Sequence, residues 1–324
     1  MRNVILGLTI LFGLFAGIPA YALTVSPAKL EVTVDPGATY HGEIELFNEQ
    51  AENKTFFSSF ENFEPRGDSG APYFIGAKDG LATWLSAAGE VTLAPSERVV
   101  VPFSITVPAN TAPGGYFAAV FFGSQPPIAQ GGGAVSIGGK IGVLILLRVS
   151  GEIEESGGLQ ELVAGDGQRF WGTMPITLSY RLNNEGGDRV VPTGEITIKN
   201  TFRLTSATLL ANENGGSVLP GSTRKFTVLW GDEPIVNQGE EVQESFFGTV
   251  KKQWSDFHFG WYTARLHLVW GESSQTAEAK YHFFIIPWQL LLLVALLLIV
   301  LFVIGRFGLR RYNNHIISQA MQRQ

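Results

Sequence analysis

Hydrophobic and polar residues alternate with a period of two along most of the chain between residues 23 and 282. The clearest runs cover residues 99–107, 141–149, 176–182 and 262–270. Because successive side chains of a β-strand point to opposite faces, each run predicts a strand with one buried and one solvated face. No stretch of this region keeps a helical period over three turns. The pattern therefore predicts an all-β body.

Turns that contain proline or glycine separate these runs, at residues 35–37, 113–115 and 219–221. Short strands at this spacing are typical of immunoglobulin-like β-sandwiches. A seam is expected at 152–158, where three glutamates precede a pair of glycines. We therefore predict two tandem sandwiches, residues 23–155 and 156–282. Two segments rich in proline and glycine, 61–88 and 124–134, are predicted to be a long loop and a connecting segment.

An apolar segment at each end of the chain predicts a targeting signal and a membrane span. Residues 4–18 follow Arg2 and end just before small residues, so residues 1–22 are predicted to be a secretory signal peptide. Residues 283–305 carry no charged side chain. A helix of this length covers about 34 Å, enough to cross a bilayer core of about 30 Å. We expect a single transmembrane helix at 283–305.

Basic residues follow this span and predict its direction. Arg306, Arg310 and Arg311 lie in the tail 306–324, which has no acidic residue. The positive-inside rule predicts a cytoplasmic C-terminus and an N-terminal body outside the cell membrane. Trp288, near the outer end of the span, suits the membrane–water interface. The expected membrane anchors are therefore Trp288, Arg306, Arg310 and Arg311.

The body between the two apolar segments is acidic and has no cysteine. Five of the 23 basic residues lie outside it, whereas all 29 acidic residues lie within it. The body therefore has 18 basic and 29 acidic residues, a net charge of about −11. Such a surface makes nucleic acid an improbable partner. An exported body without cysteine must be stabilised by packing rather than by disulfides, which favours a bacterial source.

Several short segments resemble one known family of bacterial surface proteins. In the first half they are Ser26-Pro27, Asp35-Pro36-Gly37, residues 43–48, Trp84-Leu85, residues 91–97, Pro113-Gly114-Gly115-Tyr116 and residues 140–143; in the second half they are residues 183–186, 193–196, 218–222 and 259–262. These resemble the WxL-interacting proteins, once called DUF916. The resemblance implies two immunoglobulin-like domains, the first associated with peptidoglycan binding and the second with host-protein binding, with WxL proteins as partners. It implies no particular ligand-binding residue.

An aromatic stretch late in the body is the best candidate for a binding surface. We expect Phe246 and Phe247 to end one core strand, and Trp261 and Tyr262 to begin another. Trp254 and Phe257 lie between these pairs, beside Lys251 and Lys252. Flat aromatic faces suit sugar rings and protein hot spots. The candidate partner-binding residues are therefore Trp254, Phe257, Lys251 and Lys252, with contact to the membrane surface as the alternative.

Other motifs give little support to catalysis or to metal binding. The sequence has no serine-nucleophile elbow and no pair of histidines at ligand spacing. The regular calcium-loop spacing is also absent. Arg66-Gly67-Asp68 matches the tripeptide read by integrins, but short tripeptides often occur by chance, and we interpret it as a glycine turn between polar residues. We therefore predict a protein that is not an enzyme, with no catalytic, cofactor or metal residues.

The sequence predicts non-catalytic binding at the cell surface, by edge-strand pairing and aromatic contacts, to a cell-wall polymer or a surface protein. Two alternatives stay open. One is a chaperone-like assembly factor for exported subunits, and the other is a hydrolase of cell-wall glycans or peptides. The sequence leaves the ligand and the oligomeric state open.

Overall fold

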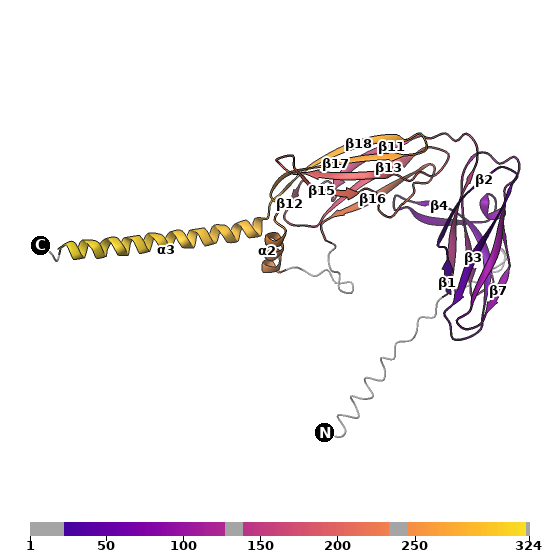
Figure 1. Ribbon diagram of the computed structural model, residues 1–324, viewed down its shortest axis with the longest axis horizontal. Helices are drawn as coiled ribbons and strands as arrows, with labels where there is room; N and C mark the ends of the chain where they lie inside the picture. The colour runs from indigo at the N-terminus through magenta and orange to yellow at the C-terminus, as the bar shows by residue number, and fades with distance from the viewer. Residues whose placement is uncertain (1–22, 127–138, 233–244, 322–324) are drawn as a thin grey trace, which may run out of the picture. The chain divides into compact units, whose positions relative to one another are not determined.

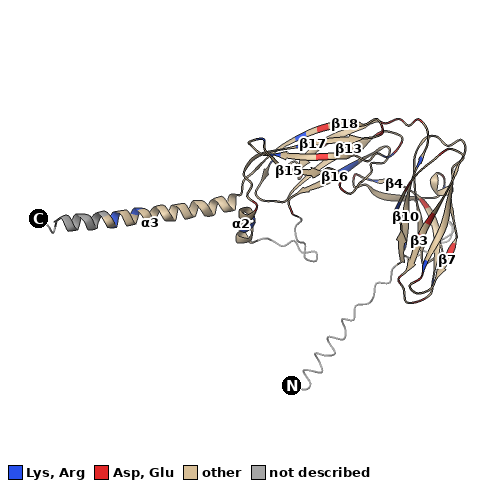
Figure 2. Ribbon diagram, viewed as in Figure 1, with Lys and Arg blue, Asp and Glu red and all other residues tan. Residues whose placement is uncertain are grey.

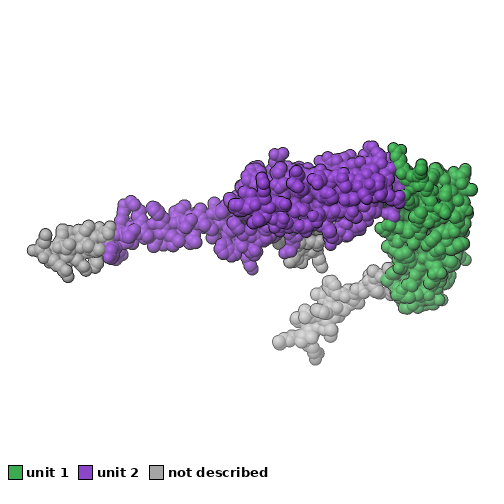
Figure 3. All heavy atoms as spheres, turned by 45° about the horizontal axis from the view of Figure 1, so that its top comes forward, with its two compact units in different colours: residues 1–66, 72–154 green, residues 67–71, 155–324 purple. Residues whose placement is uncertain are grey.

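The computed structural model describes residues 23–126, 139–232 and 245–321 (Figure 1). The predicted signal peptide and most of the connecting segment 124–134 lie outside the described residues. The chain forms two compact units (Figure 3). Unit 1 comprises residues 1–66 and 72–154, and unit 2 comprises residues 67–71 and 155–324. The boundary between residues 154 and 155 falls within the stretch where the sequence places the seam.

Unit 1 is a β-sandwich of two sheets. Its strands are β1 (Leu23–Ser26), β2 (Lys29–Val34), β3 (Thr39–Asn48), β4 (Lys54–Arg66), β5 (Ala71–Gly76), β6 (Leu85–Ala87), β7 (Glu90–Leu93), β8 (Arg98–Thr106), β9 (Gly114–Gly123) and β10 (Lys140–Val149). One sheet has the order β1-β3-β8-β6, and the other has the order β2-β10-β9-β4-β5, with β7 paired to β4. The alternation predicted at 99–107 is real, because Val101, Phe103 and Ile105 are buried while the residues between them face outward.

Unit 2 is a second sandwich, followed by two helices. Its elements are β11 (Gly157–Ala164), β12 (Phe170–Trp171), β13 (Ile176–Asn184), β14 (Thr193–Lys199), β15 (Thr205–Leu210), β16 (Ser222–Trp230), α2 (Phe246–Ser255), β17 (Gly260–Trp270), β18 (Gln275–Ile285) and α3 (Trp288–Met321). A three-stranded sheet, β11-β13-β16, packs on a five-stranded sheet, β12-β18-β17-β14-β15. The fold class is thus all-β and immunoglobulin-like, with one long C-terminal helix.

In each unit, a buried asparagine at the end of a strand forms hydrogen bonds to the backbone of neighbouring loops. Asn184, at the end of β13, donates through Nδ2 to the carbonyls of Asp188 (2.8 Å) and Val218 (2.9 Å) and accepts through Oδ1 from the Gly186 N–H. Asn48, at the end of β3, bonds in the same way to the backbone of the loops beside it. Both side chains are almost fully buried. In both units, therefore, an asparagine side chain holds a loop against the end of a strand by hydrogen bonds.

Helix α3 begins later than the sequence predicted. Phe283 and Ile285 belong to β18 and lie in the core of unit 2, so the helix starts only at Trp288, just after Pro287. Its first part, Trp288–Tyr312, contains an 18-residue stretch with a mean hydropathy of 3.0 and is long and apolar enough to cross a membrane. Figure 2 shows this apolar stretch in tan, followed by basic positions in blue.

Two further predictions were wrong, and one was confirmed. Residues 61–88 are largely ordered, as the end of β4, the whole of β5, a 3₁₀ turn (Leu81–Thr83) and β6. Phe246 and Phe247 do not end a strand but begin helix α2, with Phe247 72% exposed. The prediction that Trp261 and Tyr262 begin a strand is confirmed, because both lie at the start of β17. The Tyr262 side chain is buried there, whereas that of Trp261 is exposed.

The integrin-like tripeptide lies at the turn between β4 and β5. Residues 67–71 of this turn belong to unit 2. The Asp68 carboxylate accepts a hydrogen bond from Arg181 Nε at 3.1 Å. Because an integrin would need this carboxylate for itself, the ion pair favours a structural role for the tripeptide.

Candidate functional site

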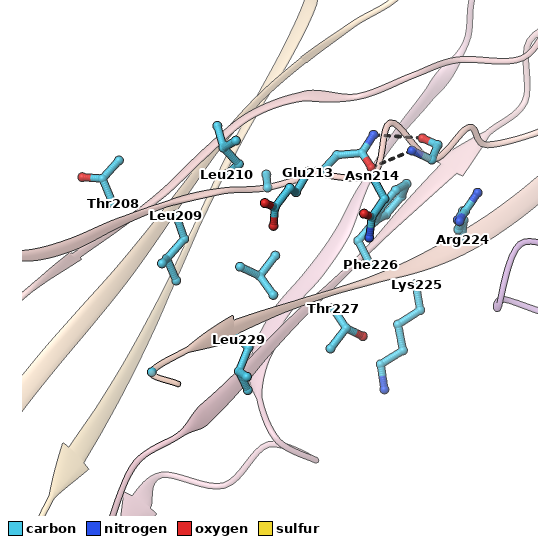
Figure 4. Close-up of a pocket in the computed structure, with 15 residues that line it drawn as sticks. Thr208, Leu209, Leu210, Glu213, Asn214, Arg224, Lys225, Phe226, Thr227 and Leu229 are labelled. Carbon is cyan, nitrogen blue, oxygen red and sulfur yellow. Dashed lines mark hydrogen bonds between the residues drawn. The ribbon is translucent and has the colours of Figure 1, made fainter. Parts of the chain in front are cut away.

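A groove opens along one side of the unit 2 sandwich, between the edges of its two sheets. β15 is the last strand of the five-stranded sheet, and β16 is the last strand of the three-stranded sheet. The hollow between them has a volume of about 640 Å³. Figure 4 shows Leu209 on the β15 side, Phe226 and Thr227 on the β16 side, and Glu213 in the loop beyond β15.

The edge of β16 offers backbone groups to a partner. Lys225 donates its N–H to the Asp68 carbonyl at 2.7 Å, which shows that the backbone groups of Lys225 point away from β13. Backbone groups alternate between the two edges of a strand, so those of Thr227 and Leu229 point the same way. Within the described residues, these two amides have no hydrogen-bond partner. About four residues of the strand therefore present an open edge.

The edge of β15 is open in the same sense. Ala211, directly after the strand, donates its N–H to Gly194 of β14 at 3.0 Å. By alternation, the backbone groups of Leu210 and Thr208 face away from β14. Only β14 pairs with β15 among the described strands. Two unpaired edges thus flank one hollow, which is the arrangement that an added strand requires.

The floor of the groove is apolar. Leu209 and Val228 are half-buried and pack against the core of unit 2, and Phe226 is buried between them and Tyr180. The Phe226 and Tyr180 rings are stacked, with centroids 4.9 Å apart, and the Tyr180 hydroxyl donates to the Ala211 carbonyl at 3.0 Å. Alternate apolar side chains of an inserted strand would find this floor beneath them.

One end of the groove is closed by a polar loop. Asn212 accepts from the Gly216 N–H at 2.8 Å and donates to the Gly216 carbonyl at 2.9 Å, as the dashed lines in Figure 4 show. Arg224 donates to the Ser217 carbonyl at 2.8 Å and lies over the Phe226 ring. Burial lowers the pKa of Arg224 from its ordinary value, and the nearby Tyr180 opposes this. The closed end thus carries a partly desolvated positive charge.

Two buried tyrosines make the stability of unit 2 depend on pH. Burial raises the pKa of Tyr180, with Arg224 opposing, and burial also raises the pKa of Tyr262. The folded protein keeps these protons where the unfolded chain loses them, above about pH 10. The free energy of unfolding should therefore fall as the pH rises above about 10, by up to about 1.4 kcal/mol per pH unit for each tyrosine.

Unfolding in urea between about pH 9 and about pH 11 measures this slope. Tyr180→Phe should make the slope shallower by up to about 1.4 kcal/mol per pH unit. Equal slopes in the two proteins would show that Tyr180 titrates alike in the folded and the unfolded states.

The residues predicted from the sequence lie elsewhere in unit 2. Lys251, Lys252 and Trp254 are on α2, and Phe257 follows directly after it. Trp254 is 73% exposed and Phe257 is also exposed. They gather beside the start of α3, where Phe246 contacts Trp288 (ring centroids 6.3 Å apart), and none of them lines the groove. Arg306, Arg310 and Arg311 follow further along α3.

The sequence analysis did not predict the groove. The order of strands in a sheet shows which strands form its edges, and the sequence does not give that order. Among the described residues, no group of three or more His, Asp or Glu side chains is placed to hold a metal ion. The described residues that line the groove include no histidine. The backbone edges and the apolar floor suit the binding of an extended chain.

Comparisons with known proteins give only distant similarities to solved structures. No family model and no curated protein matches the chain. A class 5 fimbriae chaperone, CfaA, is similar with a TM-score of 0.38 and 10% identity, over 82% of this chain and 100% of that one. The E. coli chaperone DraB is similar with a TM-score of 0.35 and 7% identity, over 81% and 97% of the two chains. The CsuC–CsuE chaperone–tip adhesion subunit complex of Acinetobacter baumannii is similar with a TM-score of 0.35 and 10% identity, over 82% of this chain and 99% of that one.

Proposed function

We propose that this protein is a non-catalytic, membrane-anchored binding protein that holds an extended segment of a partner protein in the groove between β15 and β16. The observation that carries the proposal is the pair of unpaired strand edges on either side of an apolar hollow. A segment entering there would gain backbone hydrogen bonds from both edges. Its alternate side chains would cover Leu209 and Val228.

The chemistry of the groove favours a polypeptide over a cell-wall sugar. Strand edges present N–H and C=O groups at the regular spacing of another strand. Sugar rings are bound instead by exposed aromatic faces. Among the described residues that line the groove, Phe226 is the only aromatic one, and it is buried. The partner class that follows is a surface or exported protein with an extended apolar–polar segment.

Anchorage in the membrane is the second part of the proposal. Trp288–Tyr312 has the length and hydropathy of a membrane span, and only 6% of its most apolar window is buried within the protein. Arg306, Arg310 and Arg311 follow its apolar core, which favours a cytoplasmic C-terminus by the positive-inside rule. Unit 1 and the sandwich of unit 2 would then lie on the outer side of the cell membrane.

A chaperone-like assembly factor is the second candidate, and an edge in unit 1 favours it. β2 pairs only with Leu144–Val149 of β10, which leaves residues 140–143 of β10 with a second edge open among the described strands. This edge borders a hollow of about 370 Å³, lined by Leu23, Phe56, Phe122 and Ile141 among others. An exported subunit that lacks a strand could pair there until it is assembled.

Peptide selection tests the proposal without a known partner. The full-length protein in lipid nanodiscs is used to select binders from a display library of random peptides of about 12 residues, long enough for a strand. The selected peptides should carry apolar residues at every second position. Binding should slow amide hydrogen exchange at Thr227 and Leu229. Protection at residues 140–143 instead would favour the chaperone-like candidate, and no enrichment over empty nanodiscs would refute strand capture.

A further inference from the structure

Large apolar side chains that are exposed on unit 2 ahead of α3 gather at one end of the sandwich. They come from β12, from the β14–β15 loop, from α2, from the segment after α2, and from the start of β17; they are Phe170, Phe202, Leu204, Phe246, Phe247, Trp254, Phe257, Phe259 and Trp261. Phe202 is the most exposed of them, at 81%. Among the described residues of unit 2 before α3, Leu210 is the sole exposed large apolar side chain outside this group.

Strand register puts these residues at the end from which α3 emerges. β18 ends at Ile285, three residues before α3, and its Phe284 pairs with both Phe170 and Trp261. Thr201, in the same loop as Phe202, exchanges hydrogen bonds with the backbone of Trp261 at 3.0 and 3.1 Å. The exposed apolar side chains thus lie at the end of the sandwich where α3 begins, and one of them, Phe246, contacts Trp288 in its first turn. We call them, together with Trp288, the aromatic collar.

Polar groups fasten α2 beside this first turn (Figure 1). Gln253 is only 2% exposed. Its Oε1 accepts from the Leu290 N–H at 2.9 Å, and its Nε2 donates to the Gly172 carbonyl at 2.8 Å and to Gln289. The amide of one side chain therefore joins α2, the segment after β12, and the start of α3. The collar residues on α2 are therefore held beside the start of α3.

The burial pattern of α2 is the reverse of that in a helix on a water-exposed surface. Thr249 and Gln253 are its buried residues, whereas Phe246, Phe247 and Trp254 are exposed. A surface helix in water buries its apolar face and exposes its polar one. An exposed aromatic face next to a membrane span is expected where the surroundings are lipid headgroups and the upper part of the acyl chains.

We infer that the aromatic collar is embedded in the outer interface of the bilayer that α3 crosses. This rests on the proposed membrane anchorage, and continuity of the collar with the first turn of the span names lipid as its occupant. With α2 fixed to α3 and the collar set in lipid, unit 2 stands on the membrane in one orientation. The groove between β15 and β16 then has one fixed direction relative to the bilayer.

Spin labels test this, because the natural chain has no cysteine. Single variants Phe202→Cys, Phe247→Cys and Trp254→Cys of the full-length protein are labelled in phosphatidylcholine liposomes, with Leu210→Cys as the matched exposed control and Leu297→Cys as the marker of the span. Oxygen concentrates in lipid and a nickel chelate stays in water. The ratio of the two accessibilities should be several-fold higher at the three collar sites than at Leu210→Cys, and highest at Leu297→Cys.

Each other outcome has a distinct meaning. If the collar labels give the same accessibility ratio as Leu210→Cys while the Leu297→Cys label lies deep in the bilayer, the collar is not in lipid. The proposed membrane anchorage would then still stand. A Leu297→Cys label exposed to the nickel chelate would overturn the anchorage itself. Collar labels shielded from both reagents would show that a second copy or another protein covers the collar, which also overturns contact with lipid.

Discussion

Thr227→Pro should weaken peptide capture in the groove by about 10- to 100-fold while leaving unit 2 folded. The Thr227 N–H points outward from β16, so proline removes a donor that the partner needs and none that β13 uses. The proline ring would also stand where an added strand must approach. Edge strands tolerate proline at such outward positions. Affinities of the selected peptides, measured with the protein in nanodiscs, give the size of the effect.

Thr227→Ala is the matched control, because it removes the side chain and keeps the backbone donor. Its affinity should stay within about twofold of the natural protein. Circular dichroism and the thermal midpoint confirm that both variants are folded. If Thr227→Pro binds the selected peptides as tightly as Thr227→Ala does, the partner does not pair with β16, and the groove needs another explanation.

Alternation in the sequence predicted the strands well where one face packs on a core. β8, β10, β13 and β17 all bury alternate residues. The same rule misled at the end of β18, where Phe283 and Ile285 are core residues that run directly into the apolar helix. Pro287 marks the transition from β18 to α3, since proline is favoured in the first turn of a helix. The position of this proline could have been used to predict where the helix begins.

Helix α2 could not be found from a pattern of apolar residues. A helix is recognised by the apolar stripe that it buries, and α2 instead buries Thr249 and Gln253 and exposes its aromatic side chains. The solvent on that side is proposed to be lipid, so the usual rule is inverted there. Trp254 and Phe257 were nevertheless identified as candidate partner-binding residues, with membrane contact as the alternative.

The groove lay beyond sequence reasoning for a different reason. β15 and β16 are adjacent in the chain but belong to different sheets. A sequence shows that a strand exists, but it does not show which neighbours the strand acquires or which edge stays open. The buried asparagines are an intermediate case: Asn48 and Asn184 share the dipeptide Asn-Glu, but the same dipeptide also occurs at residues 212–213, so it does not identify them in a single sequence.

Asn184→Ala should lower the free energy of unfolding of unit 2 by about 3–5 kcal/mol. Alanine removes the hydrogen bonds to the Asp188 carbonyl and from the Gly186 N–H in a site that is almost fully buried. It also removes one of the two hydrogen bonds to the Val218 carbonyl, which still accepts from the Val190 N–H at 2.9 Å. An unsatisfied buried polar group costs about 1–3 kcal/mol, and total stabilities are only about 5–15 kcal/mol. The loss should therefore leave unit 2 only marginally folded.

The neighbouring residue provides the control for this substitution. Asn183 bonds only to the side chains of Glu185 and Thr223, at 2.8 and 3.1 Å, so both partners can turn to water when it is removed. Asn183→Ala should cost less than about 1 kcal/mol. The two variants are compared by unfolding in urea in detergent micelles. Limited proteolysis at sites within residues 155–285 reports the unfolding of unit 2. Equal losses would mean that the loop after β13 is held by packing, and that the asparagine shared by both units is not what fastens it.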